Sequence, residues 1–216
     1  MQTKNYIQKY LSNEIKKRGK ALIFTSGGKS VKKVFFQLSK INIDWSKVEI
    51  FFIDERQLKK NNFNSNYNLV SSYLIKNLSR NLKLNFLGNE YLLKKKLNKL
   101  ILLIQKHKPI TIMGMGEDGH IASIFQKSLK YKNLINFNLS PSYVLTEKIG
   151  KPKVKRITMN IKMIGLSSKI ILVLNNKNKQ KLFKKYTQNK DFETPVYYLF
   201  TKLKRKMLLS LGSKIL

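Results

Sequence analysis

The stretch Ala21-Leu22-Ile23-Phe24-Thr25-Ser26-Gly27-Gly28 indicates the fold most clearly in this 216-residue chain. Its first five residues form an apolar run without polar alternation, and Ser26-Gly27-Gly28 ends that run with the residues of a turn. The next residues have apolar side chains at the spacing of one helix face: Val31, Val34, Phe35 and Leu38. The pattern therefore predicts a buried strand, a tight turn and an amphipathic helix, in that order.

The same alternation of apolar strands and helices recurs along the chain. Further strands are predicted at 48–53, 110–113 and 170–174, short extended segments at 143–146 and 156–161, and a last strand at 205–210 before a short tail. Helices are predicted around three sets of apolar residues: Val70, Tyr73, Leu74 and Leu78; Leu93, Leu97, Leu100, Ile101 and Ile104; and Leu182, Phe183 and Tyr186. Strands of this kind, separated by helices, predict an α/β fold with a mostly parallel, Rossmann-like sheet covered on both faces.

Composition indicates an ordinary globular protein, with 42% hydrophobic residues. No linker or repeat divides the sequence, so one domain is expected over residues 1–216. The lack of Cys excludes a disulfide framework and a thiolate metal site. No apolar stretch reaches about 18 residues and no segment resembles a signal peptide, so no membrane partner is expected and the predicted location is the cytoplasm.

The charge of the chain is unusual, because 44 Lys and Arg against 11 Asp and Glu give +33. Taken alone, this charge favours a polyanionic partner such as nucleic acid. However, 39 of the 44 are Lys, and Asn and Ile are abundant while Ala occurs twice, which is the pattern that A/T-rich codons produce. No nucleic-acid-binding motif accompanies the charge, so specific nucleic-acid binding is retained only as a remote alternative.

Four polar or glycine-rich clusters follow the predicted strands: Ser26-Gly27-Gly28, Asp54-Glu55-Arg56, 114–120 and 175–179. In open parallel sheets, ligands bind outside the carboxyl ends of the strands. Each cluster alone could be a simple turn. Together they predict one site that contains Gly, Arg, Asp and His.

The candidate residues have both a functional and an ordinary interpretation. Backbone N–H groups at Gly27 and Gly28, next to a helix N-terminus, could bind an anion such as phosphate. Arg56 and Arg156 are two of only five Arg in a Lys-rich chain, which makes them candidates for bidentate recognition of an oxyanion. Asp54 and Arg56 could instead form a surface ion pair of little energetic value.

His120 lies two residues after Asp118 in a glycine-rich turn. It could be a general base held by a carboxylate, or an incidental residue beside an Asp118 helix cap. The other histidine, His107, is expected to be a solvated surface group. Serine-hydrolase, Walker and dinucleotide motifs are lacking, and a zinc site is improbable with one suitable His and no Cys.

Several blocks, in chain order, resemble those of the 6-phosphogluconolactonases. They are Thr25-Ser26-Gly27-Gly28, Asp44-Trp45-Ser46-Lys47-Val48, the run from Phe51 to Arg56, Ser65-Asn66-Tyr67-Asn68, the run from Gly114 to Phe125, Arg156-Ile157-Thr158-Met159, and the strand 170–174 with Lys179. The resemblance runs from about residue 20 to about residue 201. The related glucosamine-6-phosphate deaminases, an alternative, carry Asp-Glu-Tyr at 54–56 and Phe-Asn-Glu after the His block, which this chain lacks.

The resemblance implies hydrolysis of 6-phospho-D-glucono-1,5-lactone to 6-phosphogluconate, in the oxidative pentose phosphate pathway. His120 would take a proton from water and Asp118 would orient it, while Arg56 would stabilise the oxyanion. Asp54 would contact sugar hydroxyls or position Arg56. The phosphate would lie against residues that share the same rim: Ser26, Gly27, Gly28, Lys29, Arg156 and Lys179.

The sequence also departs from the family pattern at two places. Lys29-Ser30-Val31 replaces the usual Ser-Thr-Pro, although Ser30 could still cap the helix and Lys29 could contact phosphate. The altered turn at 175–180 leaves Lys177 and Lys181 as alternatives to Lys179. No metal or organic cofactor is expected, and a monomer or weak dimer is predicted.

Overall fold

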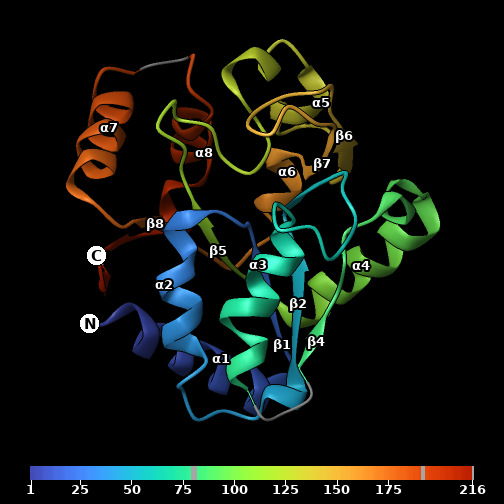
Figure 1. Cartoon of the computed structure of the whole chain (residues 1–216), viewed down its shortest axis with the longest axis vertical. Coiled ribbons are helices and arrows are strands. Elements are labelled where there is room, and N and C mark those ends of the chain that lie inside the picture. The colour runs from blue at the N-terminus through green and yellow to red at the C-terminus, as the bar shows by residue number, and fades with distance from the viewer. Residues whose placement is uncertain (79–81, 191–192, 216) are drawn as a thin grey trace.

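A seven-stranded sheet forms the centre of the molecule, in the order β10-β9-β8-β5-β1-β2-β4 (Figure 1). The computed structural model describes residues 1–78, 82–190 and 193–215. The strands are β1 Ala21–Thr25, β2 Val48–Phe52, β4 Lys83–Leu84, β5 Ile110–Gly114, β8 Lys169–Leu174, β9 Met207–Leu211 and β10 Lys214–Ile215. All neighbouring strands pair in parallel except β10 with β9, which confirms the predicted mostly parallel sheet.

The strand order reverses at β1, because β2 pairs on one side of it and β5 on the other. Chains leaving the carboxyl ends of β1 and β5 therefore move apart and leave a crevice, which is where ligands bind in folds of this type. The first predicted cluster, Ser26-Gly27-Gly28, and the cluster at 114–120 leave the sheet at this point.

Helices cover both faces of the sheet. The longer ones are α1 Thr3–Arg18, α2 Lys29–Leu38, α3 Asn66–Tyr73, α4 Lys94–His107, α7 Lys177–Gln188 and α8 Pro195–Leu203, and the short ones are α5 Lys132–Ile135 and α6 Ile161–Ile164. In Figure 1, α2 and α3 lie in front of the sheet, and these two helices contact each other. Of the described helices, none is long and apolar enough to cross a membrane.

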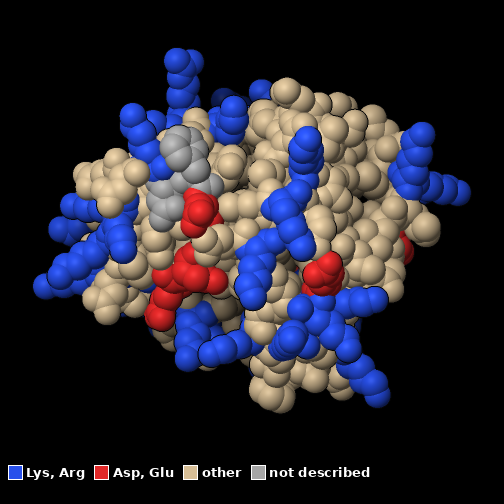
Figure 2. Space-filling view, turned by 90° about the horizontal axis from the view of Figure 1, so that it is seen from above, with Lys and Arg blue, Asp and Glu red and all other residues tan. Residues whose placement is uncertain are grey.

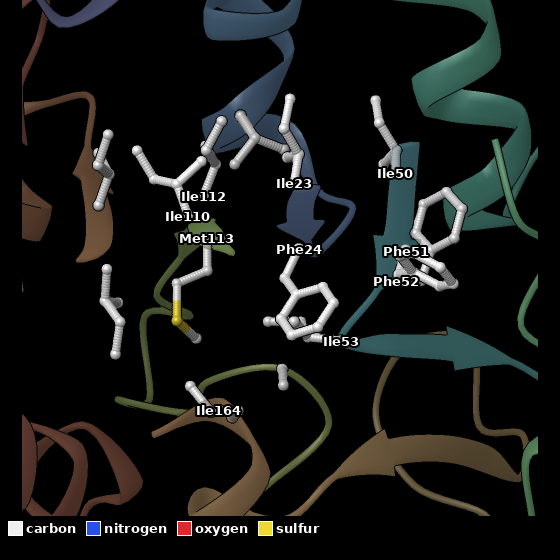
Figure 3. Packing of buried hydrophobic residues seen from close by; sticks show 14 of the residues in the cluster. Ile23, Phe24, Ile50, Phe51, Phe52, Ile53, Ile110, Ile112, Met113 and Ile164 are labelled. Carbon is white, nitrogen blue, oxygen red and sulfur yellow. The ribbon is translucent and has the colours of Figure 1, made fainter. Parts of the chain in front are cut away.

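The core lies along the strands next to the crevice. Figure 3 shows Ile23 and Phe24 of β1 between Ile112 of β5 and Ile50 of β2, with Ile164 of α6 across from them. All five side chains are fully buried or nearly so. This continuous burial explains why the strand sequences lack polar alternation.

A second, antiparallel sheet was not predicted. It consists of β3 Asp54–Arg56, β7 Arg156–Met159 and β6 Tyr143–Leu145. The chain passes from the large sheet into this one through Ile53, whose N–H donates to Thr25 O and whose carbonyl accepts from Met159 N. The extended segments predicted at 143–146 and 156–161 are confirmed by β6 and β7. Asp54-Glu55-Arg56 was predicted as the cluster that ends a strand, and neither the strand β3 nor the pairing of the three strands was predicted.

Other expectations at the ends of elements were wrong. Tyr73 and Leu93 are exposed, because α3 ends at Tyr73 and Leu93 is the residue before α4. The predicted segment 156–161 stops at Met159, since the Asn160 side chain caps α6 by accepting from Met163 N. The tail contains β10, and α1 and α8 were missed.

His107 is buried rather than solvated, with 5% of its surface exposed. It is the last residue of α4, three residues before β5 begins. Burial, together with the charge of Lys106, lowers the pKa of His107. The polar sequence around it predicted exposure, but the helix turns this residue toward the sheet.

Candidate active site

A cavity of about 230 Å³ lies at the carboxyl edge of the large sheet. All four predicted clusters contribute to its wall, which comprises Ser26, Gly27, Gly28, Lys29, Ser30, Asp54, Arg56, Asn66, Gly114, Met115, Gly116, His120, Ala122, Arg156 and Lys179. An outer cavity of about 620 Å³ shares Arg56, His120 and Arg156 with it and adds Asp118. The structure thus brings together every residue that the sequence nominated.

His120 is held by a tight loop that follows β5. Gly116 N donates to His120 O, and Gly119 has φ +75°, a conformation that favours glycine. Asp118 Oδ1 lies 2.5 Å from His120 Nδ1. This hydrogen bond lowers the pKa of Asp118. Residues 115–125 form turns and isolated bridges, so the alternative of a helix capped by Asp118 is wrong.

Helices from the C-terminal part of the chain support this loop. Val196 N, in α8, donates to Gly119 O, and the Tyr186 hydroxyl of α7 donates to Glu117 O. A side chain at Gly119 would meet Thr194 and Tyr186 at about 3 Å. The unpredicted helix α8 therefore fixes the loop that carries His120.

The two arginines of the cavity lie directly opposite each other. Arg56 of β3 pairs with Arg156 of β7 in the antiparallel register, which sets Cβ atoms of such a pair about 5 Å apart. Burial lowers the pKa of Arg156, and the charge of Arg56 lowers it further, while the nearby carboxylates of Asp54 and Glu55 act in the opposite direction. The arrangement places two guanidinium groups where an anion could bind both.

Arg56 is oriented by an asparagine that the sequence argument did not nominate. Its Nη1 donates to Asn64 O and to Asn66 Oδ1, while its buried Nε has no hydrogen-bond partner among the described residues. Asn66 Nδ2 in turn donates to Asp54 O, 2.8 Å away. Gly27 is required beside it, because a Cβ there would lie 2.0 Å from Asn66 Oδ1.

Asp54 is buried, with 4% of its surface exposed, so the surface ion pair with Arg56 considered from the sequence is wrong. Ser123 Oγ donates to Asp54 Oδ2 at 2.6 Å. The neighbouring Glu55 is fully buried, and its carboxylate accepts hydrogen bonds from four donors: Ser65 Oγ and the backbone N–H groups of Arg56, Asn66 and Tyr67. Glu55 therefore anchors the start of α3, including Asn66, to β3.

Lys179 provides an amine from α7. Its Nζ donates to Ser30 Oγ at 2.7 Å and to Met115 O at 2.6 Å, which ties α7 to α2 and to the β5 loop. Burial lowers its pKa. Of the three lysines considered from the sequence, Lys179 lines the cavity, whereas Lys177 and Lys181 are not among the described residues of its wall.

Gly28 directly precedes α2 and has φ +100°, a conformation that only glycine adopts readily. It is the N-cap residue, so the expected cap by Ser30 is wrong, and the Ser30 hydroxyl accepts from Lys179 instead. The backbone N–H groups at the start of this ten-residue helix face the cavity wall formed by Gly28, Lys29 and Ser30. Among the described residues, no group of His, Cys, Asp or Glu could hold a metal ion.

The sequence pattern of the family described as "Glucosamine-6-phosphate isomerases/6-phosphogluconolactonase" matches residues 1–208. The chain belongs to this family. It is 30% identical to a 6-phosphogluconolactonase of Xylella fastidiosa over 86% of this chain and 79% of that protein. It is 27% identical to the 6-phosphogluconolactonase of Neisseria meningitidis over 86% of this chain and 82% of that one.

Solved structures agree with this membership of the glucosamine-6-phosphate isomerase/6-phosphogluconolactonase family. The crystal structure of a 6-phosphogluconolactonase from Shewanella baltica has a TM-score of 0.77 at 25% identity, and the match covers 96% of this chain and 89% of that one. Asn66 was part of the block 65–68 that carried the family resemblance. Its contact with Gly27 and Arg56 could be found only once the two loops were seen together.

Proposed function

We propose that this chain is an enzyme that hydrolyses 6-phospho-D-glucono-1,5-lactone to 6-phospho-D-gluconate, in the oxidative pentose phosphate pathway. The observation that carries the proposal is the pair of adjoining cavities in which a His–Asp pair meets two opposed arginines and a half-buried lysine. A phosphorylated sugar lactone supplies both an ester carbonyl for the histidine and an anion for the cations.

Water activation is assigned to His120. Since the hydrogen bond with His120 lowers the pKa of Asp118, that group is a carboxylate at neutral pH and accepts the proton on Nδ1. The other ring nitrogen, Nε2, is then unprotonated and can take a proton from water as it attacks the lactone carbonyl. Asp118 also stabilises the imidazolium that this step produces.

Attack on the carbonyl carbon places negative charge on the carbonyl oxygen, and Arg56 is the proposed partner of that oxyanion. Its Nη1 is already engaged by Asn64 and Asn66, so the guanidinium is held in place before substrate binds. Asp54 is fixed by Ser123 and Asn66, which suits it to a hydrogen bond with a sugar hydroxyl and to holding Asn66 beside Arg56. Collapse of the intermediate breaks the ring C–O bond, and the protonated His120 returns its proton to the leaving oxygen.

The phosphate is proposed to bind Arg156, Lys179 and the backbone of Ser26, Gly27 and Gly28, with Lys29 at the rim. Arg156 Nε and Nη2 hold the carbonyls of Ile149 and Pro152, so its position is fixed by the protein. A dianionic phosphate near Lys179 would offset the cost of burying that amine. No metal or organic cofactor is required by these steps.

The domain organisation, the partners and the location of the enzyme are also proposed. The continuous hydrophobic cluster from α1 to α8 supports a single domain over residues 1–216. Figure 2 shows Lys and Arg scattered over the visible face, with acidic and uncharged surface between them. A small-molecule substrate without a specific nucleic-acid partner is proposed. A cytoplasmic monomer or weak dimer, with no membrane partner, is proposed.

The decisive test measures loss of freshly prepared 6-phosphogluconolactone above its spontaneous hydrolysis. The wild-type protein is expected to accelerate it, and His120→Ala is expected to remove the acceleration. Turnover of glucosamine 6-phosphate, assayed in parallel, is expected to be undetectable. A folded wild-type protein without lactonase activity contradicts the proposal, and deaminase activity would replace it with the other reaction of the family.

A further inference from the structure

Phe125 makes a contact with His120 that the proposed reaction does not use directly. The two rings stack with centroids 4.3 Å apart and an angle of 24° between their planes. Phe125 is 9% exposed and lines the outer cavity beside His120. Phe125 ends the run from Gly114 to Phe125 that resembles the family, and that pattern assigns it no role.

The Phe125 ring is itself fixed from several sides. Its backbone N–H donates to Ser128 Oγ, and its carbonyl accepts from Ser128 N. At the para carbon the ring meets Gly150, where an added Cβ would lie 2.9 Å from that carbon. Gly150 has φ +77°, so the backbone there approaches the ring in a conformation that favours glycine.

The same ring also contacts a phosphate-binding candidate. Arg156 Cζ lies over it at 5.5 Å, within the range of a cation–π interaction. Arg156 is anchored by the carbonyls of Ile149 and Pro152, on either side of Gly150. One phenyl ring therefore packs against the proposed base and against the proposed anion-binding guanidinium.

His120 needs a second restraint in addition to Asp118. A single hydrogen bond at Nδ1 fixes one atom of the imidazole, but the ring can still tilt about that bond and carry Nε2 away from the substrate. A stacked ring fixes the plane, and the face of an aromatic ring also attracts the imidazolium that forms during the reaction. Misplacing a reacting group by about 1 Å can cost roughly a hundredfold in rate.

We propose that Phe125 is a positioning residue for His120: it holds the plane of the imidazole so that Nε2 faces the lactone. This role rests on the proposed function. It acts on the chemical step more than on substrate binding, because the phosphate contacts of Arg156 are set mainly by its two backbone carbonyls.

The test compares Phe125→Leu with wild type in steady-state lactonase kinetics and in proton NMR. The kcat is expected to fall at least about tenfold, with KM changed less than about twofold. The chain has only two His, so two imidazole spin systems are expected. Loss of the ring current of Phe125 is expected to move the His120 ring protons downfield and to leave those of His107 in place.

Phe51→Leu is the matched control, since Phe51 is also a buried phenylalanine in a ring–ring contact, with Phe24, and lies outside both cavities' described walls. It should lose stability without losing kcat or moving the His120 signals. If Phe125→Leu does not fold, Phe125→Met removes the ring with less change in shape.

A folded, ring-free variant with wild-type kcat, or with unmoved His120 resonances, overturns the proposal. An equal loss of kcat in Phe51→Leu does so as well, because the effect would then reflect general packing. An inactive wild-type protein overturns the proposed function itself, whereas an active one that tolerates loss of the ring overturns only the role of Phe125.

Discussion

The two ends of the parallel strands hold the two histidines of the chain in opposite settings. At the amino end of β5, His107 is buried, its Nδ1 has no hydrogen-bond partner among the described residues, and its pKa is lowered by burial and by Lys106. At the carboxyl end of the same strand, the His120 side chain is 31% exposed and shares a hydrogen bond with Asp118. Both lie near one β-strand, so the difference comes from their partners and from access to a cavity.

The acidic residues show the same contrast between the two ends. At the amino end, Glu49 is buried and ion-paired with Lys20 and Lys83. Burial opposes its ionisation, but hydrogen bonds from Lys83 and Lys20 lower its pKa. At the carboxyl end, Asp54 is held by neutral Ser123 and Asn66, near two opposed arginines. The amino end satisfies its charges internally, and the carboxyl end leaves positive charge for a ligand.

The largest expected effect comes from replacing each histidine with glutamine, whose side chain is a neutral amide. His120→Gln is expected to lower kcat by roughly 10³-fold, since Gln cannot accept a proton from water. His107→Gln is expected to keep kcat within about twofold and to lower the Tm instead. Steady-state kinetics and thermal unfolding of both variants measure this. Equal losses of kcat would show that the two ends do not differ in function.

Asp118→Asn sharpens the comparison by changing only the partner of His120. The amide can donate to Nδ1, which places the imidazole proton on Nε2 and removes the base. We expect kcat to fall roughly 10²-fold with little change in KM. Asp44→Asn, at another exposed aspartate away from the cavity, is the control. Unchanged kcat in Asp118→Asn would contradict the assigned proton position.

Lys179→Met is expected to act on binding of the phosphate group. The KM for the phosphorylated lactone should rise roughly tenfold, because a charge-assisted contact to phosphate is lost. Turnover of glucono-1,5-lactone without phosphate should change far less. Lys181→Met, two residues along α7, is the matched control. If Lys179→Met raises the KM equally for both substrates, the lysine does not bind the phosphate. Its role is then to stabilise the fold through its hydrogen bonds with Ser30 and Met115.

The smallest expected effect is on stability against pH. Because the fold lowers the pKa of His107 from 6.5, the unfolded chain binds the proton more readily, and stability falls as the pH drops below about 6.5. Thermal unfolding at pH 7.5 and 5.5 should therefore show a larger drop in Tm for wild type than for His107→Gln. Equal drops would mean that His107 titrates as it does in water.

Sequence patterns predicted the inner strands β1, β2, β5 and β8 well, because these strands are apolar and buried almost throughout. The two-residue edge strands β4 and β10 were not predicted. The cavity was also predictable, since four clusters had to leave the same edge of a parallel sheet. Two strands of the small sheet, β6 and β7, were predicted as extended segments, but β3 was not, and the pairing of all three depends on contacts distant in sequence. His107 was misplaced for a similar reason: its burial depends on which face of α4 meets the sheet.

The contribution of helix α8 to the site was likewise invisible from local sequence. Val196 N reaches Gly119 O across 77 positions, and neither residue's neighbours indicate the other. Stacking of Phe125 on His120 also depends on the turns between them rather than on helical or strand spacing.

Ile53 sets the length of the connection between the two sheets. It joins β2 to β3 with a single residue and bonds to both sheets, at Thr25 and at Met159. A one-residue insertion or deletion here would reverse which side chains of β3 face each side, bringing Glu55 to the cavity in place of Asp54 and Arg56. The spacing from Val48 to Arg56 is therefore expected to tolerate no change of length in this chain.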